Sequence, residues 1–153
     1  MKPYKRPVSV LVVIHTPDLS VLVLERASHP GYWQSVTGSQ EEGESLAATA
    51  RREVLEETGI DSDRFQLLDW QQSNDFEIFP EWRHRYAPGV TRNTEHVFSL
   101  EVPPGLPIRL APAEHLAHDW VDWRQAAERC FSWSNRDAIL ALPDHLTGQR
   151  YPS

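Results

Sequence analysis

Three glutamates in one short segment have the type and the spacing of a cation site. Glu53, Glu56 and Glu57 stand three and four residues apart, the intervals that bring side chains to one side of an α-helix. Like charges placed in this way repel one another, so they require a cation when they are partly removed from water. Carboxylate oxygens favour Mg²⁺ or Mn²⁺, and the sequence has no cysteine cluster or paired histidines of the kind that bind zinc. The alternative is a solvated acidic helix face without a ligand.

The residues before these glutamates add features of a phosphate site. Gly38 and Gly43 bracket a loop whose backbone can approach a phosphate chain closely, because glycine has no side chain. Arg52 can orient a neighbouring carboxylate through paired hydrogen bonds, and Glu44 is its expected partner. Hydrolysis of a phosphoanhydride needs charge neutralised on the bridging and leaving oxygens and a water held in line. The segment therefore predicts metal-assisted phosphoanhydride hydrolysis.

The spacing of these residues resembles the signature of a known family. The sequence from Gly38 to Ile60 matches G-x5-E-x7-R-E-U-x-E-E-x-G-U, in which U is aliphatic, at every specified position. This pattern is the Nudix box, so the chain resembles the Nudix hydrolases. The resemblance implies an α/β/α sandwich around a mixed sheet, and metal-dependent hydrolysis of a nucleoside diphosphate linked to another group, with Mg²⁺ as the ion and Mn²⁺ as a substitute.

The resemblance also implies roles for individual residues. Within the box, it makes Glu53 and Glu57 the principal metal ligands, Glu56 a further ligand or water activator, Arg52 and Glu44 a supporting pair, and Gly38 and Gly43 the residues that shape the loop. Family members often recruit another carboxylate from a loop before a late strand, and Glu114 occupies that kind of position. We expect Glu114 to be a metal ligand or the general base, and its plainer interpretation is a surface carboxylate.

Segments outside the box resemble the branch of the family that acts on a pterin triphosphate in folate synthesis. They begin at Tyr4, Tyr32, Phe76, Arg83, Glu114 and Ser132. The resemblance implies conversion of 7,8-dihydroneopterin triphosphate to the monophosphate and pyrophosphate. Two alternatives stay open: a general nucleoside triphosphate pyrophosphohydrolase that cleans the nucleotide pool, and a non-catalytic domain that senses a nucleotide.

Basic, aromatic and hydroxyl side chains are candidates for binding such a substrate. Arginine binds phosphate oxygens through two hydrogen bonds, and flat rings stack on a pterin. The candidates are Lys5, Arg26, Thr37 and Ser132, with Arg83 and Arg85 as further cations and Trp33 and Trp133 as further rings. The resemblance also favours the segment Phe76, Glu77, Ile78 and Phe79 as one that contacts the ligand. Surface charge or core packing is the plainer interpretation of each. We assign no role to the scattered histidines, which are His84, His96, His115 and His118.

Local patterns predict the elements that must position these residues. Helix formers over 46–58, followed by Gly59, predict the helix that carries the glutamates. Two apolar runs around a turn at 16–20 predict a β-hairpin. The other elements follow from similar signals: hairpin strands at 7–14 and 21–24, strands at 33–37, 65–70, 76–79, 94–102 and 118–121, and helices at 123–130 and from 135 to just before Pro143, with Ser134 as the last N-cap. The expected fold class is α+β.

Length and composition limit the class of protein. The chain has 153 residues, a formal net charge of −7 and one cysteine, Cys130, so it has no intrachain disulfide. No repeat or linker divides it, and we expect one domain over 1–153 with the box at 38–60. The acidic balance argues against nucleic-acid binding, and no run is long and apolar enough to cross a membrane. We expect a cytoplasmic enzyme for a small pterin or nucleoside triphosphate, without a nucleic-acid, membrane or obligate protein partner.

Overall fold

Seven strands form one mixed sheet in the computed structural model, which describes residues 4–150 and the side chains of residues 4–146. The strands are β1 Val8–His15, β2 Ser20–Arg26, β3 Trp33–Gln34, β4 Val36–Ser39, β5 Gln66–Glu77, β6 Arg92–Glu101 and β7 His115–Asp122. The helices are α1 Leu46–Thr58, α2 Trp123–Arg129 and α3 Trp133–Arg150, with short 3-10 helices η1 Ser62–Arg64 and η2 Pro80–Arg85. The α+β class is confirmed. The expected domain range of 1–153 also includes 1–3 and 151–153, which lie outside the described residues.

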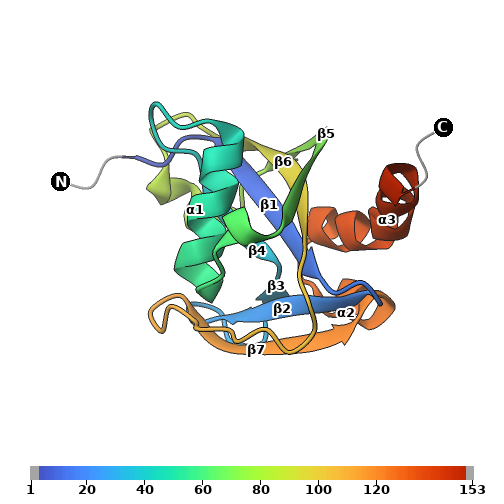
Figure 1. Ribbon diagram of the computed structural model, residues 1–153. Coiled ribbons are helices and arrows are strands. Elements are labelled where there is room, and N and C mark those ends of the chain that lie inside the picture. Colours follow the sequence, from blue (N-terminus) through green and yellow to red (C-terminus); the bar gives the residue numbers. More distant parts are fainter. Residues whose placement is uncertain (1–3, 151–153) are drawn as a thin grey trace.

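Strand β1 is the central strand of the sheet. It runs parallel to β6 along its whole length and antiparallel to β4 on its other side. β1 and β2 form the predicted antiparallel hairpin, in which His15 lies opposite Val21 beside the turn. Beyond that turn β2 diverges from β1 and pairs with β3 and β7 (Figure 1). The divergence brings β7 and its preceding loop to the end of β2.

Helices cover both faces of this sheet (Figure 1). Val10, Val12 and Ile14 of β1 pack toward α1, whereas Leu11 and Val13 pack toward α2 and α3. Burial on both faces explains why β1 is a continuous apolar run rather than an alternating one. Each fully buried aliphatic side chain of this kind stabilises the fold by about 1.5–3 kcal/mol. The arrangement is the expected α/β/α sandwich.

The helix α1 has both of its predicted ends. The Ser45 hydroxyl accepts a hydrogen bond from the backbone N–H of Ala48 at 3.1 Å. Gly59 ends the helix with φ 76°, a left-handed conformation that glycine adopts without strain. Ala50 and Val54 bury one face of the helix against the sheet. Packing of this face fixes the direction of the acidic side chains beside it.

The predicted strands 65–70 and 76–79 are wrong as separate elements, because β5 runs continuously over Gln66–Glu77. Its ladder with β6 is irregular between Asp69 and Ser73, and Gln71 has φ 54°. The middle of β5 is polar and mostly exposed, so the apolar pattern that marks a strand is absent there. Ile78 and Phe79 lie beyond the end of this strand.

The predicted strand 33–37 is also divided, at Ser35. Its backbone N–H donates to Asn135 Oδ1 at 2.7 Å, a bond to a side chain in place of a ladder bond. β3 and β4 therefore pair with different partners, β2 and β1 respectively. A side chain one hundred residues away determines this break.

The predicted end of the last helix before Pro143 is wrong, since α3 extends over Trp133–Arg150, and the helix begins two residues before the predicted start near 135. Ser132, not Ser134, caps it by accepting from the Asn135 N–H at 3.2 Å. A proline inside a helix costs about 3 kcal/mol. Leu142 and Leu146 are buried on either side of Pro143 and offset this cost. Among the described residues, no helix combines the length and the apolar character needed to cross a bilayer.

Candidate functional site

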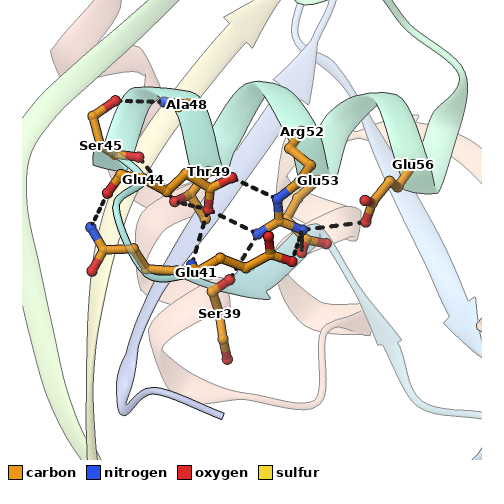
Figure 2. A network of polar contacts seen from close by, with 10 residues as sticks. Ser39, Glu41, Glu44, Ser45, Ala48, Thr49, Arg52, Glu53 and Glu56 are labelled. Carbon is orange, nitrogen blue, oxygen red and sulfur yellow. Dashed lines mark hydrogen bonds and ion pairs between the residues drawn. The ribbon is translucent and has the colours of Figure 1, made fainter. Parts of the chain in front are cut away.

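Arg52 connects the loop before α1 to the glutamates of the helix (Figure 2). Its Nε and Nη2 atoms donate to both carboxylate oxygens of Glu44, at 2.7 and 3.0 Å. Nη2 also donates to the Ser39 carbonyl at 3.0 Å, and Nη1 donates to Glu53 at 2.7 Å. The structure thus brings the two residues of the expected supporting pair together. One guanidinium holds β4, the loop and α1 in a fixed relation.

Glu44 is the fixed point of the loop. Its carboxylate accepts hydrogen bonds from the Thr49 hydroxyl at 2.7 Å and from the Glu41 backbone N–H at 3.0 Å (Figure 2). Hydrogen bonds from Arg52 are the largest of the causes that lower the Glu44 pKa to about 2. Gly43, with φ 79°, makes the turn that precedes Glu44. The loop is therefore ordered by the chain's own contacts.

We expect Glu44→Gln to lower the free energy of unfolding at neutral pH by on the order of 2 to 3 kcal/mol, because the ion pair is lost. A carboxylate with a depressed pKa stabilises the folded state above its unfolded value near 4.5, and this contribution disappears as the pH falls toward 2. Urea unfolding followed by circular dichroism should show a difference between the two proteins that shrinks below about pH 4.5. Glu42→Gln, which changes an exposed carboxylate of the same loop, is the control. A pH-independent difference would contradict the assignment.

Gly38 leaves room for the Glu53 carboxylate against the sheet. A Cβ atom at Gly38 would lie 2.1 Å from Cδ of Glu53, far inside van der Waals contact. Gly38 belongs to β4, where it lies opposite Val10 of β1. The glycine is required here because a side chain approaches its backbone, which is a different reason from the turn at Gly43.

Glu53 and Glu57 are buried carboxylates, whereas the Glu56 side chain is 52% exposed. Both oxygens of Glu57 are buried without a hydrogen-bond partner among the described residues. Burial raises the pKa of Glu57, and the neighbouring Glu53 raises it further. Burial also raises the pKa of Glu53. Two adjacent buried carboxylates, one with unpaired oxygens, fit a divalent cation that oxygen ligands hold.

Glu114 and His115 lie beside Glu57. Each of the three offers a ligand atom, and these atoms lie within 4.8 Å of one another. Glu114 is exposed at the end of the loop before β7, and His115 is buried with Nε2 3.5 Å from Glu57 Oε1. Burial lowers the His115 pKa to about 4, so this ring is neutral at physiological pH. The structure therefore places Glu114 beside Glu57 and adds His115, a histidine to which we assigned no role.

A group of cations faces this acidic cluster. The pKa of Arg26 responds to the charges of Arg85, Glu57 and Glu114. The pKa of Lys5 responds to the charges of Arg85 and Glu53. Desolvation is the main cause that lowers the pKa of both Arg26 and Lys5, and Arg85 lowers each further. These cations repel one another, and the negative charge of a bound polyphosphate would neutralise theirs.

Aromatic rings continue the site beyond Arg26. The Arg26 guanidinium lies 4.8 Å from the centre of the Trp82 ring. Trp82 lies 5.1 Å from Phe79 and 6.1 Å from Phe131, and Phe131 stacks on Tyr32 at 4.9 Å. Phe79 and Tyr32 are 42% and 39% exposed, so this group, the aromatic cluster, has accessible ring surface. Of its members, only Phe79 was a predicted binding residue.

The other residues of the predicted segment 76–79 have varied surroundings. Phe76 and Glu77 are in β5, and Glu77 forms an ion pair with Arg83 at 3.3 Å. Ile78 is buried, and its backbone N–H donates to the Thr91 carbonyl. Among the described residues of this segment, only Phe79 contacts rings of the aromatic cluster, namely those of Trp82 and Phe131.

The predicted hydroxyls and the two remaining tryptophans lie on the α3 side. Thr37 donates to the Val10 carbonyl at 3.0 Å, and Ser132 caps α3. Trp33 packs into the core beneath α2 and α3, which is its plainer interpretation. Trp133 is 46% exposed.

Comparison with known proteins gives consistent matches. The profile of the NUDIX domain matches residues 5–142. Dihydroneopterin triphosphate diphosphatase of Escherichia coli strain K12 is 53% identical over 141 residues, which are 90% of this chain and 93% of that protein. The protein of the same name from Haemophilus influenzae is 43% identical over 143 residues, which are 91% of this chain and 89% of that protein. The structure of the E. coli dihydroneopterin triphosphate pyrophosphohydrolase superposes with a TM-score of 0.84 at 53% identity, covering 90% of this chain and 95% of that one.

Proposed function

Because the chain belongs to the Nudix family of hydrolases, we propose that it hydrolyses 7,8-dihydroneopterin triphosphate to dihydroneopterin monophosphate and pyrophosphate. The observation that carries the reaction type is the pair of buried carboxylates, Glu53 and Glu57, beside the exposed Glu114 and the cations around Arg26. Similarity over most of the chain to proteins that bear this activity in their names supports the substrate. The aromatic cluster beyond Arg26 is suited to stack on a flat pterin.

We propose Mg²⁺ as the metal, with Mn²⁺ as a substitute, held by Glu53 and Glu57 and with Glu56 as a further ligand. Nudix hydrolases generally use a divalent metal, and the unpaired oxygens of Glu57 fit one. When bound, such an ion neutralises phosphate charge and lowers the pKa of water. The Arg52–Glu44 pair keeps Glu53 in place on the helix.

The protein's own side chains bind and orient the rest of the substrate in this proposal. Arg26, Lys5 and Arg85 bind phosphate oxygens, and the rings of the aromatic cluster stack on the pterin. Glu114 is exposed beside Glu57, so its carboxylate is placed to take the proton of the attacking water. Charge is neutralised at one end of the substrate while the ring is held at the other.

The decisive experiment measures pyrophosphate release with Mg²⁺ from dihydroneopterin triphosphate beside deoxynucleoside triphosphates, nucleoside triphosphates, ADP-ribose and diadenosine polyphosphates at equal concentration. A higher kcat/KM for the pterin, with the monophosphate as co-product, is the expected result. Addition of EDTA should abolish the reaction. A flat profile or one led by deoxynucleoside triphosphates would overturn the pterin assignment and favour cleaning of the nucleotide pool.

We expect Arg26→Ala to raise the KM for the triphosphate about tenfold or more, with a smaller effect on kcat, since a charge-assisted hydrogen bond to phosphate is lost. Steady-state kinetics under Mg²⁺ saturation measures both constants. Arg64→Ala, which removes an exposed arginine of η1, is the control. An unchanged KM in the Arg26 variant would identify Arg26 as ordinary surface charge.

A further inference from the structure

Two polar side chains of β6, Asn93 and Glu95, are buried and each has an acceptor atom without a hydrogen-bond donor among the described residues. They are 4% and 6% exposed. Asn93 Oδ1 and Glu95 Oε1 are buried and have no hydrogen-bond partner among the described residues. Buried acceptors are almost always paired, so two unpaired ones on the same strand require an explanation.

These side chains lie on the sheet face that α2 and α3 cover. They alternate with Thr94 and share the side of Val97, whose side chain packs in the core beneath these helices. Asn93 Nδ2 donates to the Ser9 hydroxyl at 2.7 Å, and Glu95 is hydrogen-bonded to Ser134 at the start of α3. These contacts fix both side chains and leave Glu95 Oε1 and Asn93 Oδ1 unpaired, and the Glu95 oxygen that is bonded to Ser134 has a second lone pair. Burial raises the Glu95 pKa to about 7, and the hydrogen bond with Ser134 acts against this shift.

The start of α3 connects this pair to the aromatic cluster. Ser134, the partner of Glu95, follows Phe131 by three residues, and Phe131 lies 6.1 Å from Trp82. Asn93 lies opposite Phe76 in the β5–β6 ladder. The two unpaired acceptors therefore lie on the ring side of the site, away from the glutamates of α1.

We propose that Glu95 and Asn93 recognise the donor edge of a 2-amino-4-oxopyrimidine ring, with the Glu95 carboxylate accepting from the ring N–H and the adjacent amino group, and Asn93 Oδ1 accepting the second amino hydrogen. The proposal deepens the proposed function and rests on it, because the pterin ring carries this edge. A carboxylate matches two parallel N–H donors as it matches the fork of arginine. Guanine presents the same edge, whereas hypoxanthine lacks the amino group. A site that offers acceptors to the amino group discriminates against a ring that lacks it, because buried oxygens of the site then stay unpaired.

The test compares Glu95→Gln with wild type on dihydroneopterin triphosphate, GTP and ITP. Glutamine keeps the shape of the side chain but presents an amide donor to the ring. We expect kcat/KM to fall about tenfold or more for the pterin and for GTP and to fall less for ITP, which keeps the ring N–H but lacks the amino group, so that the preference for GTP over ITP shrinks. Asp75→Asn, which neutralises an exposed carboxylate of the neighbouring strand, should leave this preference intact.

A binding measurement removes the dependence on catalysis. Affinity for 7,8-dihydroneopterin, followed by quenching of tryptophan fluorescence in EDTA, should fall by a similar factor in Glu95→Gln. If that variant fails to fold, Asn93→Ala should still weaken the preference for GTP over ITP. Unchanged affinity and an unchanged GTP-to-ITP ratio would overturn the proposal. A wild-type enzyme without preference for the pterin triphosphate would instead overturn the proposed function, while the GTP and ITP comparison would still test Glu95.

Discussion

Glu57→Gln is expected to lower kcat about a hundred- to a thousandfold while the fold stays intact. A metal ion supplies several kcal/mol of transition-state stabilisation, and each 1.36 kcal/mol corresponds to a factor of ten in rate. Glu57 is buried with both oxygens unpaired, so a neutral amide removes a ligand charge and leaves the packing of α1 unchanged. Loss of one of two adjacent buried carboxylates also relieves repulsion with Glu53.

The thermal midpoint of Glu57→Gln in EDTA should therefore equal or exceed that of wild type. Pyrophosphate release measures the rate, and differential scanning fluorimetry with and without Mn²⁺ measures the stability. Mn²⁺ should raise the midpoint of wild type much more than that of the variant. Glu42→Gln is the matched control. Full Mg²⁺-dependent activity in Glu57→Gln would show that this carboxylate is not a ligand.

Gly38→Ala is expected to lower kcat/KM about ten- to a hundredfold at little cost in stability. The added methyl group would overlap the end of the Glu53 side chain, 2.1 Å from Cδ, and a flexible side chain can move away cheaply. When Glu53 moves, it leaves its position beside Glu57 and its 2.7 Å hydrogen bond with Arg52. The substitution therefore damages the cation site and not the core.

Gly105→Ala separates this effect from ordinary strain. Gly105 has φ 81° and nothing within 4 Å of an added Cβ, so alanine there costs about 1–2 kcal/mol of backbone strain away from the glutamates. We expect Gly105→Ala to lose stability and keep its activity, and Gly38→Ala to do the opposite. Steady-state kinetics and urea unfolding of both variants make the comparison. Equal activity of Gly38→Ala and wild type would mean that Glu53 tolerates displacement.

The sequence predicted the elements whose determinants are local. Helix α1 carries its periodic apolar face and both caps within about fifteen residues, and the structure confirms its two ends. The determinants of β5 and α3 are tertiary. β5 continues past its polar middle because the segments on both sides of it pair with β6, and α3 passes Pro143 because Leu142 and Leu146 pack beneath it. Neither effect leaves a signal in the local pattern.

The same distinction applies to the candidate site. The box residues lie on one helix and the loop before it, so their spacing alone indicates that they meet. His115 reaches Glu57 through the pairing of β7 with β2, in which His115 lies opposite Arg26. Trp82, Tyr32 and Phe131 come from three separate segments that meet only in the folded protein. The unpaired acceptor of Glu95 follows from its neighbours, and the residue type gives no hint of it.

Strand β1 also separates two cores that can change independently during evolution. Its side chains at positions 10, 12 and 14 support the layer with the glutamates of α1, and those at 11 and 13 support the layer with the ring-binding residues that we propose. Each layer has a core of its own, so a duplicated copy can accumulate substitutions in one core while the other is conserved. A descendant can thus exchange the group it recognises and inherit the bond-breaking apparatus unchanged.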